Sequence, residues 1–343
     1  MGVTITTKVP EEVGLDRDLA IVVPAYNAEA TLGRAIASVL AQDAPNWRLI
    51  LVDDGSTDAT AAIAGDHANT DSRISYVRLE HGGVAAARNV GIARAEGEYV
   101  AFLDADDELV PEYVRAMGDF VRRYPGYDIY HPNLTVVTAD GARTPFSART
   151  EVVSWGVNDL LEECRIPVGG AVARRAMVQA VGGFRHGPCA SDYDLWLRAL
   201  SQGARALYLP VELYVYHLER SGRMSENVRA GAEAVIGTLA ELVDEPAMPA
   251  HALPRIKEAL HDRRVALTTP DVEEELVRQA VWYQDTLERW VGSRRAAVVS
   301  GAARPAARAV RPFRVAGAWM WIRLRLRARL VRQRAVREAR REQ

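Results

Sequence analysis

Short apolar runs alternate with amphipathic segments along the first 110 residues of the chain. Aliphatic and β-branched runs bounded by turn residues are typical of buried strands, whereas apolar positions three and four apart are typical of helices. The pattern predicts strands at 19–24, 48–54, 74–79 and 98–106 and helices at 28–41 and 84–95. Ser56 or Thr57 is placed to cap one more helix after the second strand. This alternation predicts an α/β fold with a mostly parallel central sheet flanked by helices.

The pattern is less regular after Pro111. It predicts a helix up to about Arg123, a strand at 128–137 with an antiparallel partner after a polar turn, a helix at 192–201 and short strands within 206–218. We therefore divide the chain into an N-terminal extension (1–18), an α/β domain (19–225), a helical region (226–300) and a basic amphipathic C-terminal helix (301–343). Within the α/β domain, the repeated βα units of residues 19–110 predict a nucleotide-binding half, and residues 111–225 form a second half.

Charge is distributed unevenly along the chain. Residues 301–343 carry thirteen Arg and two Glu, a balance of +11, in a chain whose formal net charge is −2. The rest of the chain therefore carries −13. An acidic body with a basic tail indicates that the tail is the part that would meet an anionic partner.

Cysteine content and hydropathy restrict the setting of the protein. Cys164 and Cys189 are too few for a disulfide scaffold and have no zinc-binding spacing, so a reducing, cytoplasmic setting is expected. The first 18 residues lack the apolar core of a signal peptide, and no stretch reaches the roughly 18 apolar residues that span a bilayer. We therefore expect neither export by a signal peptide nor a membrane-spanning segment.

Polar residues gather where the predicted strands end. The first strand ends in Pro24, Ala25, Tyr26 and Asn27, the second in Asp53 and Asp54, and the fourth in Asp104 and Asp106. Open α/β sheets bind ligands at the carboxyl ends of their strands. Together these residues would supply an aromatic face, carboxylates for a base or ribose, and oxygen ligands for a metal ion.

Asp104 and Asp106 stand two residues apart in the run LDADD. On a strand this spacing would place both carboxylates on one face, because side chains alternate with period two. Mg²⁺ or Mn²⁺ prefers such oxygen ligands together with phosphates and water, and it neutralises charge that develops on a departing diphosphate. The run therefore predicts a divalent-cation site. A lone Asp-x-Asp leaves open the alternative of an exposed acidic turn that caps the next helix.

The chain resembles the inverting family 2 glycosyltransferases of the GT-A fold, in their bacterial form. The resemblance is carried by VVPAYNAEATLGRAIASVLAQ, LILVDDGSTDAT and GGVAAARNVGIARAEGEYVAFLDADDELVPE, and it covers about residues 19–220. It implies a hexosyltransferase-like enzyme that transfers a sugar from a nucleotide-diphosphate donor with inversion. It also implies that residues 19–225 are the GT-A catalytic domain and that residues 111–225 are its acceptor half. UDP is the expected nucleotide, with dTDP and GDP still open, and Mn²⁺ or Mg²⁺ is the expected cofactor.

The resemblance also implies roles for single residues. The nucleoside is expected to contact Pro24, Ala25, Tyr26 and Asn27, and the base to hydrogen-bond to Asp54 or Asp53. Arg88 is expected near the nucleotide, Asp104 on the ribose or the metal, and Asp106 on the metal and the diphosphate. Without the resemblance, Arg88 would be interpreted as an ordinary surface residue of its helix.

Inverting transfer requires a base that accepts the proton of the attacking hydroxyl. The family places an acidic pair at the start of a helix after a GGF turn, and VGGFRHGPCASDYDLWLRAL matches that region, with Asp192 at the position of the catalytic base. The helix dipole favours an ionised carboxylate there. The chain departs from the family in having Ser191 where Glu is common. Asp194 is the second candidate, and a plain helix N-cap is the structural alternative for Asp192.

Downstream, YVYHLERSGRMSEN resembles the family segment that folds over the donor phosphates. It implies His217 as a further metal or diphosphate contact and Arg220 or Arg223 as a phosphate partner. A single His after a strand is also common as a structural residue, and Trp196, in the helix of Asp192, is expected in the core rather than on an acceptor platform.

The basic tail has two open interpretations. Trp319, Ile322, Leu326 and Leu330 share one side of a helix otherwise rich in Arg, which suits an anionic membrane surface and a peripheral location on the inner face of the membrane. The same helix could pack on the acidic body. The chain has no recognised nucleic-acid-binding module, so no nucleic-acid partner is expected.

The sequence thus predicts an enzyme that glycosylates a saccharide, a lipid-linked saccharide or a small molecule, in cell-surface polysaccharide or glycolipid synthesis. A catalytically silent nucleotide-sugar-binding or membrane scaffold protein is the alternative, and Ser191 is the departure that favours it. A nucleotidyltransferase would carry a Gly-rich, Lys-containing phosphate loop, and a dehydrogenase would carry GxGxxG after the first strand; the chain has PAYNAEA there.

Overall fold

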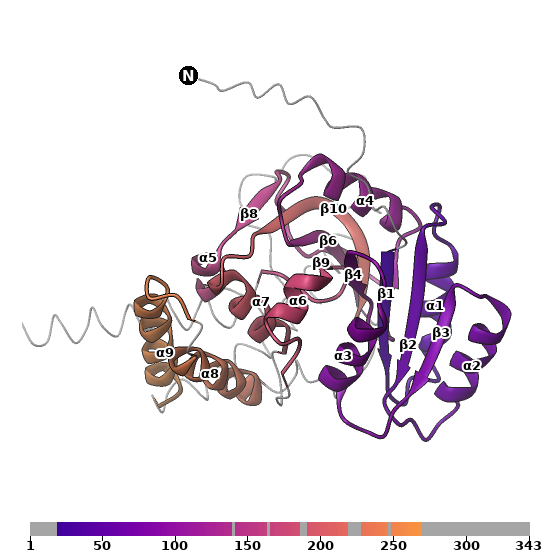
Figure 1. The fold of residues 1–343 in the computed structure, drawn as a ribbon, viewed down its shortest axis with the longest axis horizontal. Coiled ribbons are helices and arrows are strands. Elements are labelled where there is room, and N and C mark those ends of the chain that lie inside the picture. Colours follow the sequence, from indigo (N-terminus) through magenta and orange to yellow (C-terminus); the bar gives the residue numbers. More distant parts are fainter. Residues whose placement is uncertain are drawn as a thin grey trace, which may run out of the picture.

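The computed structural model describes residues 19–138, 141–162, 165–185, 191–218, 228–245 and 248–268 (Figure 1). The N-terminal extension, the basic tail, residues 269–300 of the predicted helical region, and Arg220 and Arg223 lie outside the described residues. The strands are β1 (Leu19–Ala25), β2 (Trp47–Asp53), β3 (Ile74–Arg78), β4 (Tyr99–Phe102), β5 (Glu108–Leu109), β6 (Ile129–Val137), β7 (Arg143–Pro145), β8 (Val153–Trp155), β9 (Val172–Arg174) and β10 (Ala206–His217). The helices are α1 (Leu32–Leu40), α2 (Thr60–Thr70), α3 (Val84–Arg94), α4 (Tyr113–Arg123), α5 (Val157–Glu162), α6 (Arg175–Ala180), α7 (Ser191–Ser201), α8 (Val228–Asp244) and α9 (Leu253–Thr268).

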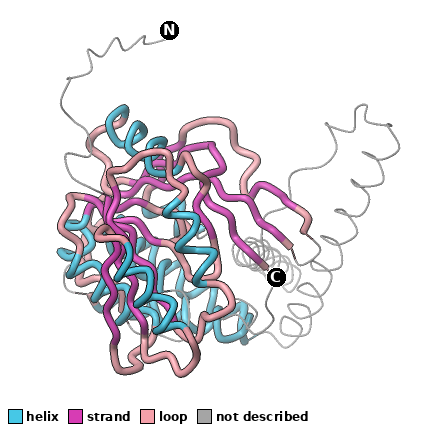
Figure 2. The backbone as a smooth tube through the Cα atoms, turned by 90° about the vertical axis from the view of Figure 1, so that its right-hand side faces the viewer, coloured by secondary structure: helices cyan, strands magenta, loops and turns pink. Residues whose placement is uncertain are grey.

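The described strands form one sheet with the order β3-β2-β1-β4-β9-β6-β10-β5, from which β7 and β8 branch at β6 and β10. Pairing is parallel from β3 to β4 and between β6 and β10, whereas β9 runs antiparallel to both β4 and β6. Figure 2 shows the strands as one layer with helices packed against it. The predicted α/β class, a central sheet flanked by helices, is confirmed. Its parallel pairs are the run from β3 to β4 and the pair of β6 with β10.

Both faces of the sheet are buried, and alternate residues of β1 show this most simply. Ala20 and Val22 pack into a cluster with residues of α3, α7, α8 and α9. Leu19, Ile21 and Val23 point the other way, into a cluster with residues of α1 and α4. A strand covered on both faces can be apolar throughout, which is why LAIVVPA shows no polar alternation.

Two predicted boundaries and one predicted helix cap are wrong. The fourth strand ends at Phe102 rather than at 106, so Asp104 and Asp106 lie in a turn. The helix predicted from 28 begins at Leu32, because the Ala28 N–H donates to Thr60 Oγ1 at 2.7 Å and residues 28–31 form a turn. The first N–H of α2, that of Thr60, is bonded to Asp58 rather than to Ser56 or Thr57.

The antiparallel partner predicted after 128–137 is confirmed as β7. The short strands predicted within 206–218 form one long strand, β10, whose pairing with β6 shifts register between Leu209 and Glu212 and between Glu212 and Tyr214. The second half of β10 also pairs with the short β5, just after the acidic run, through Tyr214 and Val215. The end of β10 is therefore held next to the carboxylates of the LDADD run.

Helices α8 and α9 pack on each other and on α5 and α7 (Figure 1). An ion pair ties α8 to the loop after α6, because Arg185 Nη2 lies 2.6 Å from Glu245 Oε2. Within the described residues, no helix is both long and apolar enough to cross a membrane. Through their contacts with α5 and α7, helices α8 and α9 stabilise the half of the domain that carries α7.

Helix α3 lies against β1 through a glycine, and this close approach can be tested. A Cβ at Gly91 would overlap the side chain of Val22, whereas a Cβ at Gly65, inside α2, would meet nothing within 4 Å. We expect Gly91→Ala to lower the free energy of unfolding by about 1–3 kcal/mol, as overpacking does. Gly65→Ala, the matched helical control, should be neutral or stabilising by up to about 1 kcal/mol. Urea denaturation measures both, and equal effects would contradict the close packing.

Candidate active site

The carboxyl ends of β1 and β2 are joined by a set of backbone and side-chain hydrogen bonds. Ala25 is in register with Asp53, and the Asp54 N–H donates to the Ala25 carbonyl at 2.8 Å. Asn27 has a positive φ of 47°, a conformation that Asn tolerates better than most residues. Its N–H donates to Ser56 Oγ at 3.0 Å, and its side-chain oxygen accepts the Thr57 N–H at 2.9 Å. These contacts fix the two loops relative to each other.

Asp54 is buried and holds the turn between β3 and α3. Its two oxygens accept the N–H groups of Gly82 and Gly83, both at 2.8 Å, and His81 Nδ1 lies 2.9 Å from Oδ2. Asp53 is also buried and accepts the Ser56 N–H and the Tyr76 hydroxyl. In the structure both carboxylates thus organise loops. Contact with a nucleotide base remains a prediction for each.

Tyr26 is the exposed aromatic residue of this edge, with 48% of its surface accessible, whereas Ala25 is buried beside it. Its ring is stacked on that of His81, with ring centroids 4.3 Å apart. Gly55 allows the backbone of His81 to lie close to the loop after β2, because a Cβ at position 55 would lie 2.9 Å from the His81 backbone nitrogen. The sequence analysis missed His81. The signal for it in the sequence is an aromatic ring directly before Gly82 and Gly83, just after a predicted strand.

Arg88 links the two halves of the domain. It is buried on α3, and its Nη2 donates to Asp104 Oδ1 at 2.7 Å, while Nη1 lies 3.5 Å from Ser191 Oγ at the start of α7. An ordinary surface role for Arg88 is therefore excluded by its burial. The residue that replaces the family's usual Glu, Ser191, meets the guanidinium that also pairs with the acidic run.

The residues from Asp104 to Asp107, with Glu108 after them, form what we call the acidic turn. The alternation of side chains along a strand does not apply to Asp104 and Asp106, because β4 has already ended at Phe102. Other elements hold the turn instead. The Asp106 carbonyl accepts a hydrogen bond from Arg34 Nη2 at 2.7 Å, and Arg34 Nε lies 3.6 Å from Glu108 Oε1.

Asp107 is the buried member of the acidic turn, and the sequence analysis did not single it out. Its oxygens accept the Tyr214 hydroxyl at 2.7 Å and the His217 N–H at 2.9 Å. Burial, together with the neighbouring Asp104 and Asp106 carboxylates, raises the pKa of Asp107 well above its ordinary value. A local sequence pattern cannot reveal this, because both hydrogen-bond donors come from β10, more than 100 residues away.

His217 also lies beside the acidic turn. Its ring nitrogen Nε2 is 2.6 Å from Glu108 Oε1, and the side chain is largely buried. The structure thus gives the ring a carboxylate partner within the protein. Contact of His217 with a metal or a diphosphate remains a prediction.

Asp192 lies in the first turn of α7, and one of its oxygens accepts the Tyr193 N–H at 2.9 Å. Burial raises the pKa of Asp192, while the nearby Arg88 guanidinium acts in the opposite direction. Its carboxyl is therefore a stronger proton acceptor than an exposed Asp. This suits the predicted base, and that role stays a prediction.

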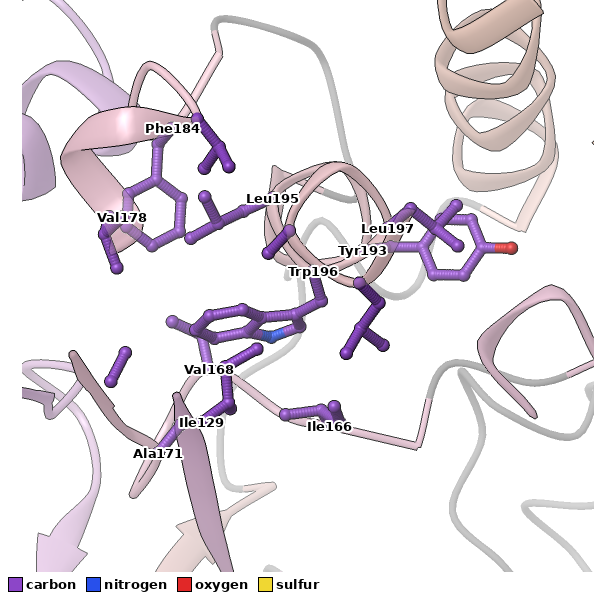
Figure 3. Packing of buried hydrophobic residues seen from close by; sticks show 14 of the residues in the cluster. Ile129, Ile166, Val168, Ala171, Val178, Phe184, Tyr193, Leu195, Trp196 and Leu197 are labelled. Carbon is purple, nitrogen blue, oxygen red and sulfur yellow. The ribbon is translucent and has the colours of Figure 1, made fainter. Parts of the chain in front are cut away.

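Asp194 has a structural position instead. Its Oδ2 accepts Nη2 of the fully buried Arg198 at 2.6 Å, and Arg198 Nη2 also donates to the Gly183 carbonyl at 2.7 Å. The ion pair lies within α7, and the Arg198 guanidinium fastens the helix to the GGF turn through the Gly183 carbonyl. Trp196 is likewise in the core, as predicted, and Figure 3 shows it pointing from α7 to Ile129 and Val168.

The donor set of the acidic turn fits a divalent cation that binds together with a diphosphate. Asp104 and Asp106 offer carboxylate oxygens, the ligands that Mg²⁺ and Mn²⁺ prefer. Over the described part of the chain, no three His, Cys, Asp or Glu side chains are grouped as a complete metal site. Phosphate oxygens and water would have to complete the coordination, which is common for Mg²⁺ in nucleotide enzymes.

Solved structures share this fold. TarS of S. aureus, residues 1–349, in complex with UDP-GlcNAc, is 22% identical and superposes with a TM-score of 0.61 over 76% of this chain and 78% of that one. The complex of the same protein with UDP gives a TM-score of 0.57 over 76% of this chain. The predicted GT-A fold is thus confirmed.

Sequence comparisons identify the family. A model of glycosyl transferase family 2 matches residues 20–181. Succinoglycan biosynthesis protein ExoO of Rhizobium meliloti is 31% identical over 262 residues, which cover 72% of this chain and 73% of that protein. Glycosyltransferase GlyA of Streptococcus pneumoniae is 37% identical over 103 residues, which cover 30% of this chain but 15% of GlyA, so that likeness concerns one segment. With ExoO matched over most of its length, the chain belongs to glycosyl transferase family 2 and is a glycosyltransferase.

Proposed function

We propose that this glycosyltransferase transfers a sugar from a UDP-sugar to an acceptor hydroxyl with inversion, with a divalent metal on the acidic turn and Asp192 as the base. The observation that carries the proposal is the placement of Arg88, whose guanidinium lies between Asp104 and Ser191, the neighbour of Asp192. This placement supports the assignment of the donor-side carboxylates and the candidate base to one site. The bound UDP-GlcNAc of the TarS structure supports the choice of nucleotide.

The donor would be held at the ends of β1, β2 and β4. The exposed ring of Tyr26, stacked on His81, offers an aromatic face for the base. Pro24, Ala25, Asn27, Asp53 and Asp54 would shape the surroundings of the nucleoside. Asp104 and Asp106 would hold Mn²⁺ or Mg²⁺, which neutralises the charge of the leaving diphosphate. Arg88 can pair with an anionic oxygen as well as with Asp104, because a guanidinium presents several donors.

Asp192 would accept the proton from the acceptor hydroxyl as its oxygen forms the bond to the anomeric carbon. The bond from that carbon to the diphosphate breaks on the opposite side, and UDP leaves with the bonding electrons. The product sugar therefore has the inverted configuration, and Asp192 ends the step protonated. Its raised pKa supports the assignment, since a stronger base accepts the proton more readily.

The acceptor proposal follows the relatives. ExoO is named for succinoglycan biosynthesis, so a growing saccharide of a cell-surface polysaccharide is the proposed acceptor class. We further propose that the basic tail binds an anionic membrane surface and so brings the enzyme to a lipid-linked acceptor. Calorimetric titration of anionic vesicles into the full chain and into a chain that ends at residue 300 tests the role of the tail separately.

Nucleotide binding is the first test of the donor site. We expect UDP to bind the wild type at least tenfold more tightly with Mn²⁺ than without it, and Asp106→Ala to lose this gain, because a metal ligand is removed. Asp119→Ala, which removes an exposed carboxylate on α4 paired with Arg122, is the control and should behave as the wild type. Isothermal titration calorimetry measures all three. Equal binding of UDP with and without Mn²⁺ would refute the metal-dependent donor site.

Substitution of the base tests the chemistry. Asp192→Asn should lower donor turnover by about 10²–10⁴-fold, the usual contribution of a general base. In the wild type, kcat/KM should fall toward acid at a higher pH than an ordinary Asp would produce, because the pKa of Asp192 is raised. UDP release from the UDP-sugar that the wild type uses, followed from pH 4 to 9, measures both. Turnover by Asp192→Asn at the wild-type rate would exclude Asp192 as the base.

The same substitution should stabilise the fold at neutral pH. Because the folded pKa of Asp192 lies above the unfolded one, the folded state binds more protons, and stability falls as pH rises between the two values. Asp192→Asn removes this loss of stability. The variant should therefore be more stable than the wild type at neutral pH, and the difference should vanish below the ordinary pKa of an Asp carboxyl. Asp194→Asn is the contrasting variant. Its free energy of unfolding should be about 3–5 kcal/mol lower than that of the wild type, because the buried charge of Arg198 loses its carboxylate partner.

A further inference from the structure

A chain of hydrogen bonds joins the acidic turn to β10. The Tyr214 hydroxyl donates to Asp107 Oδ2 at 2.7 Å and accepts the backbone N–H of Asp104 at 3.3 Å. The other Asp107 oxygen accepts the His217 N–H at 2.9 Å, and the His217 ring meets Glu108. One tyrosine hydroxyl thus touches the turn at both ends, at Asp104 and at Asp107.

The ring of Tyr214 has little freedom to move. It is almost fully buried, and a Cβ at Gly169 would overlap its ring. Gly170, at a positive φ of 76°, brings the backbone against the same ring, and the Gly170 carbonyl is itself held by the Tyr113 hydroxyl at 3.0 Å. A ring confined in this way presents its hydroxyl at a fixed point.

The placement of the hydroxyl matters for the residues between its two contacts. Asp104 and Asp106 must keep their carboxylates in position while four acidic side chains crowd within five residues. Arg88 orients the Asp104 side chain and Arg34 holds the Asp106 carbonyl. Neither fixes the backbone of Asp104 or the buried carboxyl of Asp107, which are the two groups that Tyr214 bonds.

We propose that Tyr214 is a positioning residue for donor binding: its hydroxyl, through Asp107 and the Asp104 N–H, fixes the acidic turn in the geometry that binds the metal with the diphosphate. This inference rests on the proposed function. It adds a residue from the distant end of the sheet to the donor site, one that touches neither donor nor metal. The partners that orient ligand residues commonly contribute 10–100-fold, roughly, to metal affinity.

The test compares two buried tyrosines that each lose one hydroxyl. Tyr214→Phe removes the hydrogen bonds that its hydroxyl makes to Asp107 Oδ2 and to the Asp104 N–H, whereas Tyr130→Phe removes the hydrogen bond to the Tyr124 carbonyl, which is not part of the acidic turn. Calorimetric titration of UDP at a series of Mn²⁺ concentrations gives the Mn²⁺ needed for half-maximal binding. We expect this concentration to rise about tenfold or more in Tyr214→Phe and to stay at the wild-type value in Tyr130→Phe.

Melting temperatures of the two variants separate positioning from general stability. Each variant loses the hydrogen bonding of one buried tyrosine hydroxyl, so both should melt somewhat below the wild type, but Tyr214→Phe alone should change the Mn²⁺ dependence. A wild-type Mn²⁺ dependence in Tyr214→Phe overturns the positioning role and leaves the proposed function intact. Absence of any Mn²⁺ effect in the wild type overturns the proposed function itself, and this inference with it.

A second variant keeps the test decisive if Tyr214→Phe does not fold. Asp107→Asn keeps the volume of the side chain but replaces one of the two acceptor oxygens with an NH₂ group, so it cannot accept from both Tyr214 and His217. The same rise in the required Mn²⁺ is expected. A folded Asp107→Asn protein with wild-type Mn²⁺ dependence overturns the inference.

Discussion

Four carboxylates within five residues, from Asp104 to Glu108, repel one another, and the site depends on how the fold offsets that repulsion. Arg88 pairs with Asp104, and Arg34 reaches both the Asp106 carbonyl and Glu108. His217 meets Glu108, and Tyr214 bonds the buried Asp107. The partners come from α1, α3 and β10, so three elements must be in place before the acidic turn can hold its form. A cation bound by the turn would add to an arrangement that is already organised.

This requirement gives a reason for the mixed topology of the sheet. The parallel strands β1, β2 and β4 bring Tyr26 and the acidic turn to one edge. Antiparallel β9 then carries the sheet across to β6 and β10, and the end of β10 returns to the turn through β5. Gly91 and Gly169 allow the close approaches of α3 to β1 and of the chain to Tyr214. The packing of the domain and the geometry of the site therefore rest on the same contacts.

Sequence reasoning predicted the elements whose cause is local. Buried strands such as LAIVVPA and the helices carrying Arg88 and Asp192 follow from apolar periodicity, and the ordered motifs identified the family before any geometry was available. It placed Asp104 and Asp106 on a strand because their spacing fits one, whereas a turn follows Phe102. It missed His81, Asp107 and Tyr214, since their roles arise from contacts between residues far apart in the chain, as in the pairing of Tyr214 with Asp107. Asp194 was the second candidate for the base, and its buried ion pair with Arg198 was not predicted.

A crystal structure of the protein with UDP and Mn²⁺, with the metal located by its anomalous scattering, would show whether the acidic turn holds the metal together with the diphosphate. We expect Mn²⁺ at an Asp106 carboxylate oxygen and at the diphosphate, with the Tyr214–Asp107 hydrogen bond retained and Tyr26 against the base. Mn²⁺ and UDP bound away from the acidic turn, or a turn that refolds and breaks the Tyr214–Asp107 bond on binding, would contradict this expectation.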